Sequence, residues 1–112
     1  MTFKEELTKK ADEYTLITLV SKNVEDIKTQ MEQEYHLRRF VLRLIDPILP
    51  CSPGRPEEGR LSLVIPKGTS LSAYLHRYIA EFKKLGFELG KNMTTKQNFT
   101  SNGLEYKITL TW

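Results

Sequence analysis

The sequence predicts a two-layer α+β domain in which helices cover one face of a four-stranded antiparallel sheet, in the order α(α)-β-β-α-β-β. Apolar residues recur at helical spacing over residues 3–35 and 71–85, and they alternate at strand spacing over residues 37–45 and 61–65. Asn102-Gly103 then marks a tight turn between two flanks rich in strand-forming residues. With 112 residues, the chain is expected to form a single domain.

The first helix is predicted from apolar residues spaced three and four apart. These residues are Phe3, Leu7, Ala11, Tyr14, Ile17, Val20, Val24, Ile27, Met31 and Tyr35. A break is expected between Ser21 and Asn23, because their short polar side chains can end one helix and cap the next. The long periodicity also suggests a coiled-coil dimer through residues 1–35. Leu16 and Leu19 widen the stripe beyond a two-position seam, which favours packing onto a sheet.

Residues 37–45 are interpreted as a strand because apolar and polar residues alternate there, although helical spacing fits them too. Residues 61–65 alternate in the same way. The two segments are therefore predicted to pair as a long hairpin, closed by a proline-rich loop at residues 46–60.

The second helix is predicted from an apolar stripe that starts at Leu71 and ends at Leu85. Gly86 follows the stripe, and glycine readily adopts the left-handed conformation that closes the last carbonyl groups of a helix. Lys83 and Lys84 lie where the negative end of the helix dipole favours cations. The helix is therefore expected to stop at Gly86.

A two-residue turn at Asn102-Gly103 sets the expected register of the C-terminal hairpin, in which Met93 faces Trp112. The apolar residues then share the side of the hairpin that faces the helices. They are Phe99, Met93, Leu104, Tyr106, Ile108, Leu110 and Trp112. The other side is polar, so one face of the sheet is expected to be open to solvent.

This polar face is one candidate binding surface. Lys96 and Lys107, with Arg39 and Arg43 from the first strand, would form a basic patch that binds nucleic acid without sequence preference and with strong salt dependence. The aromatic residues of the hairpin fall on the core-facing side, so bases have no platform on which to stack. The favoured alternative is an ordinary solvated sheet face whose lysines discourage edge pairing.

The proline-rich loop is the other candidate surface. Because polyproline II has three residues per turn, the evenly spaced prolines Pro47, Pro50, Pro53 and Pro56 would share one edge of an extended segment. Pro50, Pro53 and Arg55 also match the pattern of two spaced prolines and a basic residue that aromatic grooves accept. The favoured alternative is a stiff connector.

A cysteine-dependent enzyme is the third hypothesis. Cys51 with His36 or His76 is the one thiol and imidazole set in the sequence, and nothing in their spacing brings them together. The spacing matches no zinc motif, and the sequence has no glycine-rich phosphate loop. No cofactor or metal is therefore expected.

Charge and cysteine content indicate the setting of the protein. Residues 1–34 carry five Lys and Arg against eight Asp and Glu, whereas residues 35–112 carry twelve against six. An acidic segment beside a basic body is expected to dock on it, or to leave a basic face free for a polyanion. A single cysteine and a charged N-terminal region predict a reducing, cytoplasmic setting, and no apolar run approaches the ~20 residues of a membrane span.

These patterns together predict a non-enzymatic binding protein. A protein partner is the first expectation and nucleic acid the second. The chain is expected to be a monomer, or a homodimer through residues 1–35.

Overall fold

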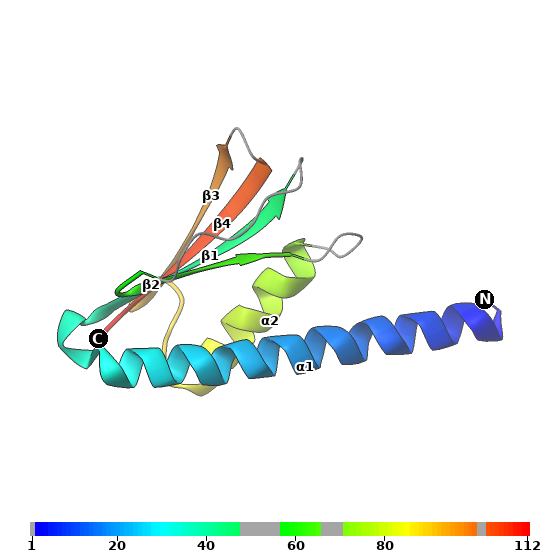
Figure 1. The fold of residues 1–112 in the computed structure, drawn as a ribbon, viewed down its shortest axis with the longest axis horizontal. Helices are drawn as coiled ribbons and strands as arrows, with labels where there is room; N and C mark the ends of the chain where they lie inside the picture. Colours follow the sequence, from blue (N-terminus) through cyan, green and yellow to red (C-terminus); the bar gives the residue numbers. More distant parts are fainter. Residues whose placement is uncertain (1, 48–56, 66–70, 101–102) are drawn as a thin grey trace.

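The computed structural model describes residues 2–47, 57–65, 71–100 and 103–112. Within these residues the elements are α1 (Phe3–Gln33), η1 (Tyr35–Leu37), β1 (Arg39–Pro47), β2 (Arg60–Val64), α2 (Leu71–Lys84), β3 (Met93–Thr100) and β4 (Gly103–Thr111). The two helices lie on one side of a four-stranded sheet (Figure 1). The predicted α+β order and the two-layer architecture are therefore confirmed.

The sheet is mixed rather than wholly antiparallel. Its strand order is β2-β1-β4-β3, and β4 pairs antiparallel with both of its neighbours, whereas β1 and β2 run parallel. The predicted hairpin between residues 37–45 and 61–65 is therefore wrong. Parallel neighbours need a connection of about a dozen residues, which lets the chain return along the first strand. Residues 48–59 provide that length.

The N-terminal helix α1 is continuous, so the predicted break between Ser21 and Asn23 is wrong. The helix begins with a capping box, in which the Thr2 side chain accepts from the Glu5 backbone N–H and Glu5 accepts from the Thr2 backbone N–H. Asn23 lies inside the continuous helix, and its Nδ2 donates a hydrogen bond to the Tyr78 hydroxyl of α2 at 2.9 Å. This tertiary bond satisfies the polar side chain in the middle of α1.

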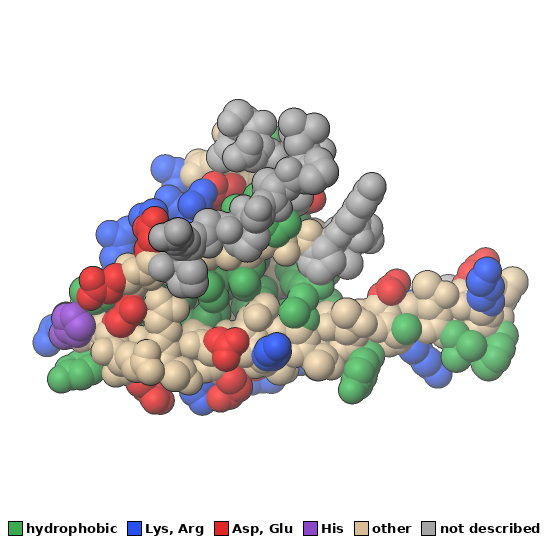
Figure 2. All heavy atoms as spheres, viewed as in Figure 1, with side chains coloured by type: hydrophobic (Ala, Val, Ile, Leu, Met, Phe, Trp, Pro, Cys, Tyr) green, Lys and Arg blue, Asp and Glu red, His purple; other side chains and the backbone are tan. Residues whose placement is uncertain are grey.

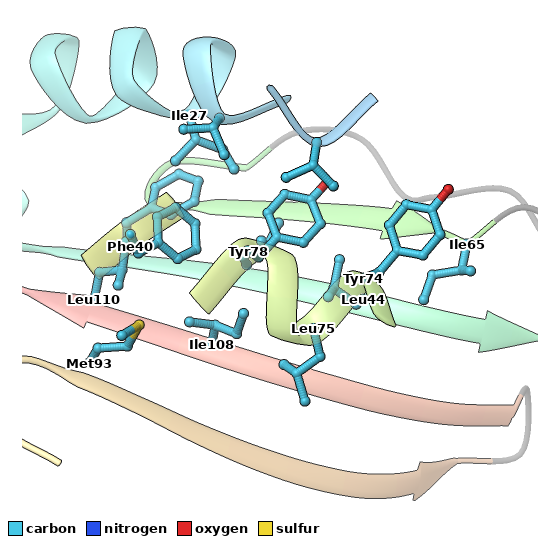
Figure 3. Packing of buried hydrophobic residues seen from close by; sticks show 14 of the residues in the cluster. Ile27, Phe40, Leu44, Ile65, Tyr74, Leu75, Tyr78, Met93, Ile108 and Leu110 are labelled. Atoms are coloured by element: carbon cyan, nitrogen blue, oxygen red, sulfur yellow. The ribbon is translucent and has the colours of Figure 1, made fainter. Parts of the chain in front are cut away.

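The second helix is confirmed as Leu71–Lys84, and Gly86 follows it with a φ of 102°. The hydrophobic core lies between the two helices and the inner face of the sheet (Figure 3). Its buried residues come from the second half of α1, from α2, from β1, β3 and β4, and from Ile65 after β2. They are Val20, Val24, Ile27, Phe40, Leu42, Leu44, Ile65, Leu71, Tyr74, Leu75, Tyr78, Phe82, Met93, Ile108 and Leu110.

The β3–β4 hairpin is confirmed, but its register differs from the predicted one by two residues. Met93 pairs with Leu110 rather than with Trp112, and Thr100 pairs with Gly103, which belongs to β4 rather than to the turn. A shift of two residues leaves every side chain on its predicted side of the sheet, because side chains alternate with a period of two. The observed register brings Met93 and Leu110, both fully buried, together in the core.

The predicted burial of Phe99 and Trp112 is wrong. Phe99 lies near the end of the edge strand β3 and is 84% exposed, and Trp112 is 41% exposed. The strands extend past the helices at the β3–β4 turn (Figure 1). The inner face of the sheet is therefore not covered at Phe99, although the same face is buried at Met93.

Candidate functional site

The first half of α1 projects beyond the rest of the molecule (Figure 1). The helix has 31 residues and a length of about 46 Å at 1.5 Å per residue, close to the longest dimension of the described chain, 51 Å. Its buried residues begin at Val20, and every residue from Thr2 to Thr15 is exposed. We call residues 3–17 the helical arm.

The helical arm carries four large, exposed apolar side chains. Phe3 is 73% exposed, Leu7 51%, Tyr14 71% and Ile17 44%. Since successive helical residues turn by about 100°, these four residues lie within about 80° of the helix circumference. We call them the arm stripe. Lys10 falls within the same arc, at its centre along the helix axis.

The arm stripe points away from the body of the domain. Val20, Val24 and Ile27, which α1 buries, lie on a face turned from the arm stripe by about 100°. Figure 2 shows hydrophobic side chains along the lower side of the arm, away from the sheet. Beyond the arm, the same face of α1 carries Ser21 and Glu25, so the apolar surface ends where the domain body begins.

The arm stripe consists of two exposed apolar pairs, Phe3 with Leu7 and Tyr14 with Ile17, with Lys10 between them. It is a candidate binding surface, because single exposed apolar side chains are common on proteins but groups of them on one face are less so. Among the described residues, Leu16 is the arm residue that packs against the core. Tertiary packing supplies most helical stability, and an isolated helix of about 15 residues is marginal in water. A partner that covers the arm stripe would therefore bury apolar surface and stabilise the arm.

The sequence contained a signal for this surface that the predicted single stripe overlooked. Leu16 and Leu19 pack against the core, and helical geometry places them about 140° or more from Tyr14. Apolar residues at such different angles cannot all face one partner. The sequence alone therefore indicates that α1 has two separate apolar faces. It does not indicate which of the two faces the domain covers.

On the outer face of the sheet, three of the basic residues predicted to form a patch lie in one row across neighbouring strands. Arg43 of β1 pairs with Lys107 of β4, which pairs with Lys96 of β3. Arg39 lies on the same face, opposite Thr111. The structure thus brings all four predicted basic residues to one side of the sheet.

Glu105 neutralises one member of this row. The Arg43 guanidinium donates two hydrogen bonds to the Glu105 carboxylate, at 2.7 and 2.9 Å, and Glu105 is only 5% exposed. These bonds lower the pKa of Glu105 and raise the pKa of Arg43, because they favour the charged form of each group. No local pattern predicted a buried glutamate here, since its burial depends on the neighbouring strand. Because Glu105 offsets the charge of Arg43, the positive charge of the row comes from Lys96 and Lys107.

The other predicted site residues are not brought together. Pro50, Pro53 and Arg55, as well as Cys51, lie outside the described residues. His36 is exposed in η1, 3.6 Å from a carboxylate oxygen of Glu58, and His76 is exposed on α2. Within the described ranges, no three His, Cys, Asp or Glu side chains gather as metal ligands.

A smaller apolar surface lies at the other end of α1. It is a depression of about 310 Å³ whose lining includes Tyr35, Leu85 and Trp112. The Trp112 indole Nε1 donates to the Tyr35 carbonyl oxygen at 3.0 Å, which holds the ring at the edge of the depression. This surface offers a comparison site for experiments on the arm.

None of the helices in the described ranges has a stretch long and apolar enough to cross a membrane. Comparison with protein-family models, with curated proteins and with solved structures finds no match to the chain. The geometry of the helical arm and of the basic row is therefore the basis for any functional assignment.

Proposed function

We propose that this chain is a non-enzymatic binding protein that docks onto a protein partner through the helical arm. The observation that carries this proposal is the arm stripe, four large apolar side chains between 44% and 73% exposed on a helical segment that the domain body leaves uncovered. Each such side chain contributes about 1.5–3 kcal/mol when burial is complete. A partner that buries this surface therefore gains part of the free energy that offsets the cost of association.

The charge of the arm favours a protein over an anionic membrane as its partner. Helices that lie on membranes carry mainly Lys and Arg on their polar face. The arm carries three cationic and four anionic side chains, Lys4, Lys9 and Lys10 against Glu5, Glu6, Asp12 and Glu13. This mixed, slightly acidic set of side chains is not attracted to an anionic membrane surface.

Replacing Leu7→Glu and Ile17→Glu together is expected to weaken partner binding at least about tenfold. The two charges interrupt the arm stripe, whereas glutamate is a good helix former and neither position is buried. The free energy of unfolding should therefore change by no more than about 0.5 kcal/mol. Quantitative affinity capture from cell extract, with urea unfolding of the same proteins, measures both effects.

Leu85→Glu is the matched control, because Leu85 is 37% exposed in the apolar depression at the other end of α1. It introduces one glutamate on a different apolar surface and should leave capture unchanged. Partners that are captured equally by the wild type and by the double arm variant would refute docking through the arm.

A second candidate function is non-specific binding of nucleic acid by the outer face of the sheet. The supporting observation is that Lys96 and Lys107 occupy directly opposite positions on β3 and β4. Like charges at opposite positions destabilise a sheet, and a phosphate group between them would relieve the repulsion. Arg39 extends the positive charge along the same face.

This second function predicts that the protein binds a labelled duplex and a labelled single strand at low salt, and that binding weakens steeply as salt rises. Lys96→Glu with Lys107→Glu should abolish the signal in fluorescence anisotropy, whereas Leu7→Glu with Ile17→Glu should not change it. Absence of binding by the wild type at low salt, or equal binding by the lysine variant, would exclude the basic row as a polyanion site.

A further inference from the structure

We infer that the partner of the helical arm is an amphipathic helix of another protein, with Lys or Arg along one border of its apolar seam. The inference rests on the proposed docking function of the arm and specifies the chemistry of the partner.

The spacing and width of the arm stripe fit a single helix. Phe3, Leu7, Lys10, Tyr14 and Ile17 follow one another at steps of four, three, four and three, which is the heptad seam of a coiled coil. A helix that packs onto a sheet or into a bundle has an apolar face at least about 100° wide, whereas the arm stripe spans about 80°. A second helix running alongside the arm covers such a narrow seam.

The border of the arm stripe defines the charge of the partner. Glu6 and Glu13 directly precede Leu7 and Tyr14 in the sequence, and both are exposed along one edge of the stripe. The opposite edge carries Lys4 and Ala11, so its one charge is positive. Charges at these border positions of a coiled coil select the partner. Basic residues at the facing positions of the partner helix would therefore form ion pairs with Glu6 and Glu13.

A second copy of the chain does not meet this requirement. In a parallel pair, the ammonium group of Lys10 meets that of the other copy in the middle of the seam. In an antiparallel pair, equivalent borders face each other, so Glu6 lies beside Glu13 of the second copy. Like charges therefore oppose each other in both orientations. A different helix with basic residues opposite Glu6 and Glu13 and an acidic residue near Lys10 complements these three charges.

Two synthetic helical peptides of about three heptads test the inference. Both carry leucine at the seam positions, and they differ only in having lysine or glutamate at the border positions. Fluorescence anisotropy with the full chain at low salt is expected to show about tenfold tighter binding of the lysine peptide. The preference should reverse for the variant Glu6→Lys/Glu13→Lys and should remain in Asp12→Lys, which changes a charge on the far side of the arm.

Equal binding of the two peptides, or binding of neither, would overturn the inference. Light scattering that shows a concentration-dependent dimer, lost in Leu7→Glu/Ile17→Glu, would also overturn it by identifying a second copy as the occupant. Each of these results is compatible with capture that depends on the arm stripe. Failure of the helix assignment is therefore distinguishable from failure of the proposed docking function.

Discussion

Replacing Phe82 by alanine is expected to lower the free energy of unfolding by about 3–5 kcal/mol. Phe82 is fully buried, and its ring stacks on Tyr78 with centroids 6.2 Å apart. Removal of the ring loses apolar burial and leaves a cavity between the helices and the sheet. A small domain has about 5–15 kcal/mol of total stability, so the variant loses a large part of it.

Phe99→Ala is the control, since it deletes the same side chain where it is 84% exposed. It is expected to change the free energy of unfolding by no more than about 0.5 kcal/mol. Urea unfolding followed by circular dichroism measures both variants. Equal losses in the two proteins would mean that the end of β3 is packed as tightly as the core, contrary to the arrangement of the sheet and helices.

The contrast with the helical arm matters for interpreting function. Phe82→Ala is expected to impair any activity by unfolding the domain, whereas arm substitutions alter a surface that the core does not use. A loss of binding in an arm variant of unchanged stability therefore reports on the interface itself.

Replacing Glu105 by glutamine is expected to lower the free energy of unfolding by about 1.5–3 kcal/mol at neutral pH. The substitution removes the charge that pairs with Arg43 and weakens two short hydrogen bonds on the outer face of the sheet. Urea unfolding of both proteins at a series of pH values measures the difference.

The pH dependence follows from the pKa of Glu105, which hydrogen bonding to Arg43 lowers below its ordinary value of 4.5. A carboxyl group with a lowered folded-state pKa contributes stability above its unfolded-state pKa, and the contribution disappears as pH falls through the folded-state value. The difference between wild type and Glu105→Gln should therefore be constant near neutral pH and shrink in acid below the ordinary pKa.

Glu88→Gln is the control for this experiment. Glu88 also lies 2.9 Å from a cation, Lys91, but both side chains are more than 60% exposed. Exposed ion pairs contribute about 0–1 kcal/mol, so this variant should be close to wild type at every pH. A Glu105→Gln deficit that stayed unchanged in acid would show that the ionised carboxylate is not its cause.

Local sequence patterns predicted most of the helices and strands and the sides of the sheet, although not the continuity of α1. The alternation along β3 and β4 assigned Lys96 and Lys107 to the outer face, and Gly86 marked the end of α2, because these features depend on spacing between near neighbours. The shared face of Arg39 and Arg43 followed from the same alternation. The basic part of the candidate site was therefore predictable.

The direction of β2, the pairing of Arg43 with Glu105 and the exposure of the arm stripe depend on contacts between distant segments. Alternation is the same in parallel and antiparallel strands, so the chain path between β1 and β2 sets their direction. Likewise, Phe3 and Val20 both belong to apolar faces of one helix, yet Phe3 is 73% exposed and Val20 is fully buried. Their difference arises from where the sheet and α2 lie along α1, because burial depends on contacts between distant segments that periodicity does not encode.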